Sequence, residues 1–317
     1  MARTNLDAWG AGWSQAEAKP ADKSRQVSGL FFRVTPESLI ELLLKACAAI
    51  AILTIVLISI FIFARGIPLI WKIGWADFIF NLKWSPSHGS YGIGAMLAGS
   101  LLVTASSLIW SVPLGILTAI FMAEIAPPKI GNMLGRMVEL LAGIPSVVFG
   151  FFGLIVIVPF IRNYLGGNGM SVLAGAIILG IMILPTIISI SRDAIRAVPG
   201  EYKEGSLALG ATHMQSIRGV ILPAARSGII TAVILGMGRA IGETMAVVMV
   251  TGNSTMLPSS ILSPVRTMTS NIVLEMGYAA GDHQAALFAT GAMLFIFIMI
   301  LNLVVSFSIK AGKNYAD

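Results

Sequence analysis

Six long runs of apolar residues are the feature that most restricts the fold of this 317-residue chain. A helix needs about 20 apolar residues to cross a bilayer, and every run is long enough. The runs do not alternate between apolar and polar residues and are too long for barrel strands, so only helices fit. The predicted transmembrane helices cover residues 39–64, 95–123, 137–160, 171–191, 220–250 and 285–309.

Charged residues are too scarce to cover a water-facing surface. The chain is 56% hydrophobic and 11% charged, whereas soluble domains carry about 25% charged residues. An all-α polytopic membrane protein is therefore predicted. Cys47 is the only cysteine and the three histidines are scattered, so we expect no internal disulfide, no metal site and no other cofactor.

The basic residues predict a direction for the chain in the membrane. Lys and Arg gather in the polar tail, in the second-to-third and fourth-to-fifth connections and at the C-terminus. Because cytoplasmic loops collect such residues, both termini should be cytoplasmic, and segments 66–92 and 252–283 should face outward. The net charge of +6 fits this bias, so no nucleic-acid partner is expected.

Three parts of the chain follow from this pattern. Residues 1–35 form a polar cytoplasmic tail, for which disorder is the default expectation. Thr35 and Pro36 are suited to cap and open the first helix of a transmembrane domain that covers residues 36–312. The core of this domain covers residues 95–309, and a loop at 192–219 interrupts it.

This loop has the pattern of two short helices with a sharp turn between them. Pro199 is suited to open the first helix, and Gly210 to end it in a left-handed conformation. Thr212 and Gln215 then form a capping box for the second helix, which continues to Pro223. Such a rigid projection could dock on a partner or lie on the lipid surface.

The same loop resembles the EAA loop of ABC importer permeases. The family pattern is Glu-Ala-Ala, three residues, Gly, nine residues and then Ile-x-Leu-Pro. The chain matches it at Glu204, Gly210, Leu222 and Pro223. It departs conservatively at Gly205, Ser206 and Val220. In this family the loop is a coupling helix that docks on the ATPase, which implies coupling roles for Glu204, Gly205, Ser206, Gly210 and Thr212.

Three further segments resemble the PstC family of phosphate-transport permeases. They read LGMGRAIGETMAV, VELLAGIPSVVFGFFGL and LGIMILPTIISISRDAIRAVP, and the resemblance extends over residues 40–310. It implies a type I ABC importer permease (MetI-like) fold in the bacterial inner membrane, with six transmembrane helices and a cytoplasmic coupling helix. The chain has no phosphate-binding loop of the form G-x-x-x-x-G-K-[ST], so ATP should be hydrolysed by another polypeptide.

The resemblance also implies the partners of this chain. They are a second homologous permease (PstA-like), two copies of an ATP-binding subunit (PstB-like) and an external phosphate-binding protein (PstS-like). Phosphate would be the cargo, and the lipid bilayer would surround the spanning helices.

Arg239 and Glu243 interrupt the fifth apolar run. A charge at a helix centre costs about 2.5–3.5 kcal/mol, so two charges call for an explanation. Residues four apart share one helical face, so the two side chains are expected to pair. The pair could simply join helices, with Gly238 and Gly242 as small packing residues. Alternatively, Arg239, Glu243 and Thr244 line the substrate path, where a guanidinium matches phosphate oxygens.

Other functions remain open at this point. Permeases for molybdate or sulfate share the loop pattern. A membrane-embedded, lipid-modifying enzyme would need a carboxylate cluster or a nucleophile beside a base, whereas Glu124, Glu139 and Asp193 appear isolated in the sequence. A structural scaffold would not explain the two charges in the fifth run. We therefore predict a transporter subunit without catalytic residues.

Overall fold

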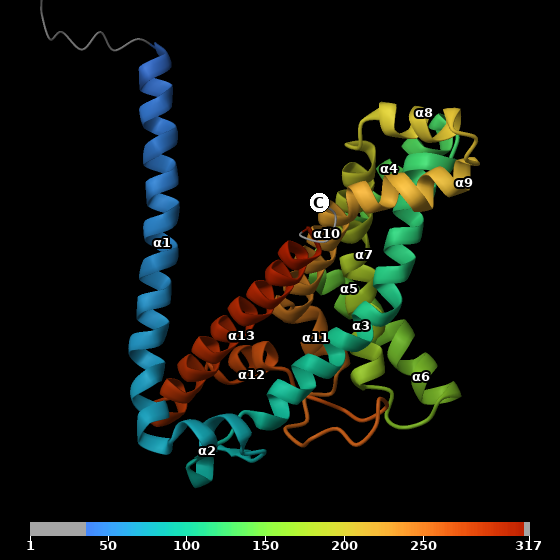
Figure 1. Ribbon diagram of the computed structural model, residues 1–317. Coiled ribbons are helices and arrows are strands. Elements are labelled where there is room, and N and C mark those ends of the chain that lie inside the picture. The colour runs from blue at the N-terminus through green and yellow to red at the C-terminus, as the bar shows by residue number, and fades with distance from the viewer. Residues whose placement is uncertain (1–35, 314–317) are drawn as a thin grey trace, which may run out of the picture. The chain divides into compact units, whose positions relative to one another are not determined.

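The computed structural model describes residues 36–313, which fall into two units (Figure 1). The first unit ends at Ile55 and, where described, is the beginning of helix α1 (Pro36–Ile73). Residues 40–55 of this helix are exposed. Helix α1 begins at Pro36, as predicted, while the capping role of Thr35 lies outside the described residues. A helix that is apolar on all sides suits a lipid environment.

The second unit begins at Val56 and holds all other elements. Its helices are α2 (Trp75–Phe80), α3 (Gly94–Ile120), α4 (Pro128–Ala142), α5 (Ser146–Phe152), α6 (Val158–Tyr164), α7 (Val172–Arg196), α8 (Gly200–Ala208), α9 (His213–Ser216), α10 (Leu222–Gly242), α11 (Met245–Val250), α12 (Met268–Glu275) and α13 (Asp282–Lys313). Wider π-helical turns are η2 (Phe121–Ile125), η3 (Gly153–Ile157) and η4 (Ile217–Ile221), and η1 (Pro86–His88) is a short 3-10 turn. Strands β1 (Trp84–Ser85) and β2 (Ser90–Tyr91) pair antiparallel, with Trp84 opposite Tyr91.

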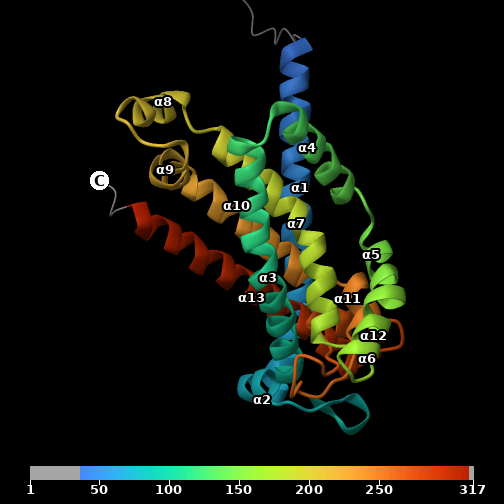
Figure 2. The ribbon, with the colours of Figure 1, turned by 90° about the vertical axis from the view of Figure 1, so that its right-hand side faces the viewer.

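Six helices in the described part of the chain are long and apolar enough to span a membrane, which confirms the predicted number. They are Ile40–Ile73, Gly94–Ile125, Ser146–Tyr164, Val172–Arg196, His213–Gly242 and Asp282–Leu303. Both views place α8, α9 and α4 at one end of α3 and α7, and α2 at the other (Figures 1 and 2). We call these the α8 end and the α2 end.

The predicted third span was wrong at its start. Residues 137–142 belong to α4, which ends before Gly143, and the spanning helix begins only at Ser146. Pro145 supplies the reason, because a proline disfavours the helical conformation of the residue before it, here Ile144. The apolar residues of α4 had extended the run without belonging to the span.

The predicted fifth span was also wrong, because it is not one helix. Helix α10 ends at Gly242, Glu243 has an extended backbone with φ −67° and ψ 135°, and α11 begins at Met245. Hydropathy does not register this break, because apolar residues continue on both sides of it. Broken helices are tolerated within membranes where the freed backbone groups find partners inside the protein.

Helix α7 forms the centre of the unit and packs along both α3 and α10. Small residues allow this close approach. A Cβ placed on Gly236 would lie 2.9 Å from Ile187 Cγ1, and one placed on Gly180 would overlap the indole ring of Trp110. Trp110 Nε1 also donates a hydrogen bond to the Ala176 carbonyl oxygen, at 3.3 Å. The Trp110 ring can therefore occupy this position only because Gly180 has no side chain.

Replacing Gly180 by Ala should lower the free energy of unfolding by about 1–3 kcal/mol, because the added methyl group would force the Trp110 ring out of its place. Thermal unfolding of the purified protein in detergent measures the effect. Gly238→Ala is the matched control, because it makes the same change within a helix, yet the added Cβ meets no atom within 4 Å. Equal unfolding midpoints for the two variants would contradict this account of the packing.

Candidate functional site

The break between α10 and α11 is held by hydrogen bonds from both sides. Glu243 Oε1 accepts a hydrogen bond from the Ala246 backbone N–H at 3.3 Å, which satisfies a donor at the start of α11. The carbonyl oxygen of Glu243 accepts a hydrogen bond from Thr269 Oγ1 at 3.0 Å. Thr269 lies on α12, so a separate helix secures the broken backbone. Glu243 thus serves as a local cap for α11.

Arg239 does not pair with Glu243. The residues described contain no ion pair between them, and Arg239 Nη1 instead donates to Thr186 Oγ1 of α7 at 3.3 Å. The predicted pairing was wrong because the helix ends at Gly242, so the spacing of four residues no longer places both side chains on one face. The Arg239 side chain is exposed in this chain. Its contact with Thr186 had no signal in the sequence.

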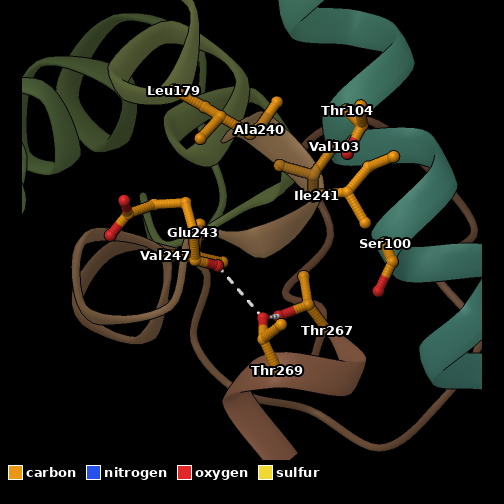
Figure 3. Close-up of a pocket in the computed structure, with 10 residues that line it drawn as sticks. All are labelled: Ser100, Val103, Thr104, Leu179, Ala240, Ile241, Glu243, Val247, Thr267 and Thr269. Atoms are coloured by element: carbon orange, nitrogen blue, oxygen red, sulfur yellow. Dashed lines mark hydrogen bonds between the residues drawn. The ribbon is translucent and has the colours of Figure 1, made fainter. Parts of the chain in front are cut away.

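A small pocket lies beside the break (Figure 3). Its lining residues come from α3, α7, α10, α11 and the start of α12, and they are Ser100, Val103, Thr104, Leu179, Ala240, Ile241, Glu243, Val247, Thr267 and Thr269. Four of the ten carry hydroxyl groups. Figure 3 shows the Glu243 carboxylate pointing away from Thr267 and Thr269. Hydroxyl groups both donate and accept hydrogen bonds, so such a lining suits a small polar solute.

The structure separates the three predicted path residues. Glu243 lines the pocket, and Arg239 immediately precedes two lining residues, Ala240 and Ile241. Thr244 is not part of the lining, and its Oγ1 donates to the Gly242 carbonyl oxygen at 3.2 Å. The hydroxyl residues of α3 and α12 were missed by the sequence analysis, because single Ser and Thr residues carry no distinguishing pattern.

Gly238 and Gly242 contact no other helix among the described residues, so their packing role stays a prediction. A Cβ built on either residue meets no atom of residues 36–313 within 4 Å. The glycines of α10 that do approach another helix are Gly228, which faces Ala194, and Gly236, which faces Ile187. Nothing in the described part of the chain therefore covers the faces of Gly238 and Gly242.

The loop after α7 has the predicted form. Helix α8 begins at Gly200 directly after Pro199, and Gly210 has a positive φ of 89°. Thr212 and Gln215 form the predicted capping box at the start of α9, which continues through η4 into α10. Ser206 Oγ donates to Ser216 Oγ at 2.6 Å and so ties α8 to α9.

The α8–α9 projection carries large apolar side chains that are exposed in the part of the chain that the structure describes. They include Tyr202 at 54% exposure, Leu207 at 40%, Leu209 at 91% and Met214 at 47%. Glu204 and Gly205 of α8 are also exposed. An exposed group of apolar residues on a rigid element is typical of a surface that binds another macromolecule.

Two acidic residues, Glu124 and Glu275, contact basic side chains that lie outside their own helices. Glu124 is not isolated, because Lys203 Nζ of α8 lies 2.6 Å from its Oε2. At the α2 end, Glu275 accepts hydrogen bonds from Trp84 Nε1 at 2.9 Å and Arg266 Nη1 at 2.6 Å, and His283 Nε2 lies 2.8 Å away. No group of three His, Cys, Asp or Glu residues suited to a metal is found among residues 36–313.

Comparison with known proteins agrees with this architecture. A family model described as "Binding-protein-dependent transport system inner membrane component" matches residues 111–311. The "Probable ABC transporter permease protein YqgH" of Bacillus subtilis is 44% identical over 272 residues, which cover 82% of this chain and 88% of the relative. The "Phosphate transport system permease protein PstC" of Mesorhizobium japonicum is 32% identical over 306 residues, covering 90% and 93% of the two chains.

Solved structures show the same fold. A bacterial ABC transporter involved in the import of the acidic polysaccharide alginate matches with a TM-score of 0.56 at 15% identity, covering 86% of this chain and 98% of that chain. The MetNI methionine ABC transporter, in inward facing conformations, gives a TM-score of 0.54 at 21% identity, covering 72% and 99%. The fold is that of the MetI-like ABC importer permeases, as the resemblance implied. The chain therefore belongs to the family of binding-protein-dependent inner membrane components, and it is a multi-pass permease subunit of an ABC importer rather than an enzyme.

Proposed function

We propose that this chain is a permease subunit of an ATP-driven importer of inorganic phosphate. The observation that carries the proposal is the exposed Arg239, which comes directly before two lining residues of a hydroxyl-lined pocket at a break in a spanning helix. The similarity to phosphate permeases supports the choice of substrate. The name of the Bacillus relative states no substrate, so the choice of phosphate also depends on the chemistry of the site.

Arg239 supplies the positive charge for the passing anion. Its one hydrogen bond within the described chain engages Nη1 alone, which leaves the other guanidinium donors to a ligand. A guanidinium presents five donors in a planar fork that matches two oxygens of a phosphate at once. The bond to Thr186 holds the fork against α7, so little side-chain entropy is lost when the anion arrives.

Glu243 favours phosphate over sulfate. Its Oε1 is engaged by the backbone of α11, and Oε2 has no partner in the part of the chain that is described. An ionised carboxylate only accepts hydrogen bonds, and phosphate at neutral pH retains a proton that it can donate. Sulfate and molybdate carry no such proton under these conditions, so the same carboxylate repels them.

The path is completed by a second permease. The faces of Gly238 and Gly242 are open in this chain, and the exposed Arg239 lies between them in sequence. Small residues on a membrane helix allow another helix to approach closely. A homologous second permease packed here would enclose the pocket, and it could add the further positive charge that a divalent anion requires.

The α8–α9 projection docks on an ATP-binding subunit, and two such subunits serve the permease pair. The exposed apolar side chains favour protein contact, because Glu204 stands among them and would be repelled by an anionic lipid surface. A phosphate-binding protein on the opposite side of the membrane delivers the anion. Both termini and the α8 end are cytoplasmic in this arrangement, and the α2 end faces outward.

Labelling of single cysteines tests this orientation. In a Cys47→Ala background, Glu201→Cys at the α8 end should resist an impermeant thiol reagent in intact cells. Ser87→Cys and Ser260→Cys should react, because both residues are exposed at the opposite end. Reaction at position 201 with protection at 87 and 260 would reverse the orientation. Permeabilised cells, in which all three variants should react, serve as the control.

Replacing Arg239 by Gln should reduce phosphate uptake at low phosphate concentration by about 10- to 100-fold. This ratio corresponds to the free energy of a hydrogen bond to a charged group. Gln can still donate to Thr186, so the change mainly removes charge. Uptake of radiolabelled phosphate into proteoliposomes that contain the assembled importer measures the effect. Arg226→Gln is the matched control, because it removes an exposed arginine from the same helix away from the pocket. Equal uptake by both variants would remove Arg239 from the path.

Glu243→Gln separates the charge of this side chain from its capping role. The amide oxygen of Gln can still accept the Ala246 N–H, so the break in the helix should persist. Without the negative charge, sulfate and molybdate should inhibit phosphate uptake more strongly than in the wild type, by about fivefold or more. Competition curves in the same proteoliposomes measure this shift. If the wild type already imports sulfate or molybdate in preference to phosphate, the proposed substrate is wrong.

A further inference from the structure

Glu124 occupies an unusual place at the α8 end of α3. Helix α3 continues past Ile120 into the wider turn η2, which contains Glu124 and ends before Pro127 and Pro128. The Glu124 side chain is 11% exposed, although it belongs to a connection between helices. A carboxylate that is shielded from water in this way needs partners, because a lone buried charge is costly.

Both short helices of the α8–α9 projection reach this one carboxylate. Lys203 Nζ of α8 donates to Glu124 Oε2 at 2.6 Å, and His213 Nε2 of α9 lies 3.7 Å from the same oxygen. Lys203 forms an ion pair with Glu124, and His213 adds a second positive charge only when its ring is protonated. Glu124 is therefore the polar contact that joins the end of α3 to both α8 and α9, next to an apolar cluster that packs Ala119 of α3 against Ile217 and Ile221 of η4.

Hydrogen bonds tie the two helices of the projection to each other. Ser206 Oγ donates to the buried Ser216 Oγ at 2.6 Å, which links α8 to α9. The turn between them is fixed by the Ala211 N–H, which donates to the Ser206 carbonyl oxygen at 3.2 Å, and by the capping box at Thr212. A movement of α8, which carries Lys203, should therefore be accompanied by a movement of α9.

The far end of α3 reaches the pocket. Ser100 and Thr104 line it, and Ser100 Oγ accepts a hydrogen bond from the Met268 N–H at 3.0 Å. The 27 residues of α3 extend about 40 Å at 1.5 Å per residue. One helix thus links the projection, through Glu124, to the residues around the break at Glu243.

We infer that Glu124 is a positioning residue that transmits movement of the α8–α9 projection to α3 and so couples ATP hydrolysis to the pocket. The inference rests on the docking role proposed above for α8 and α9. A residue that only braces the fold would affect the amount of assembled protein. A coupling residue instead changes how much substrate is moved for each ATP hydrolysed, and that ratio distinguishes the two roles.

The test compares Glu124→Gln, the charge exchange Glu124→Lys with Lys203→Glu, and Glu139→Gln. Glu139 is the matched control, because it is an exposed carboxylate on neighbouring α4. Each variant is reconstituted in proteoliposomes with the ATP-binding subunits and the binding protein. Assembly is checked by co-purification, and radiolabelled phosphate uptake and ATP hydrolysis are measured in the same vesicles.

Glu124→Gln should assemble and hydrolyse ATP, while uptake per ATP falls about tenfold or more, within the usual range of coupling between sites. The charge exchange should restore most of the ratio, and Glu139→Gln should leave it unchanged. An unchanged ratio in Glu124→Gln, no recovery in the charge exchange, or failure of both to assemble would overturn the inference. Absence of phosphate uptake by the wild type would contradict the proposed substrate instead, and the ratio would then be measured with the oxyanion that the wild type imports.

Discussion

The architecture depends on the requirement that backbone polar groups inside a bilayer find partners within the protein. A helix meets this requirement everywhere except at its ends, so a break within a span leaves several groups without partners. The chain resolves the problem at Glu243 with its own carboxylate, which accepts the Ala246 N–H, and with Thr269 of α12, which donates to its carbonyl oxygen. Helix α12 thus helps to hold the break, and the pocket lies where the break and α12 meet.

Close packing of the spanning helices then fixes where the pocket lies. Association of helices in lipid relies on packing rather than on the release of water from apolar surfaces. Small residues therefore decide which helices meet, as Gly180 does with Trp110 of α3 and Gly236 with Ile187 of α7. These contacts keep α3, α7 and α10 together along their length, and the pocket forms where their hydroxyl-bearing residues converge with α12.

Much of the fold could be predicted from hydropathy and local rules. The number of spans follows from the apolar runs, and the form of the α8–α9 projection follows from Pro199, Gly210 and the Thr212 capping box, because these are local interactions. The break at Glu243 could not be predicted, because its stabilising contact comes from Thr269, 26 residues away in sequence. The role of Glu124 escaped detection for the same reason, since Lys203 is 79 residues away.

Three shielded or half-buried carboxylates show how charge is distributed along the molecule. At the α2 end, Glu275 is matched by Arg266, and at the α8 end Glu124 is matched by Lys203. Partly buried ion pairs of this kind hold elements together, and they leave no net charge to attract a ligand. Glu243 differs, because among the described residues it meets only a backbone N–H, and Arg239 meets only a hydroxyl group. Glu243 at the pocket and Arg239 next to its lining in sequence thus keep bonding capacity that a passing anion or a second subunit can use.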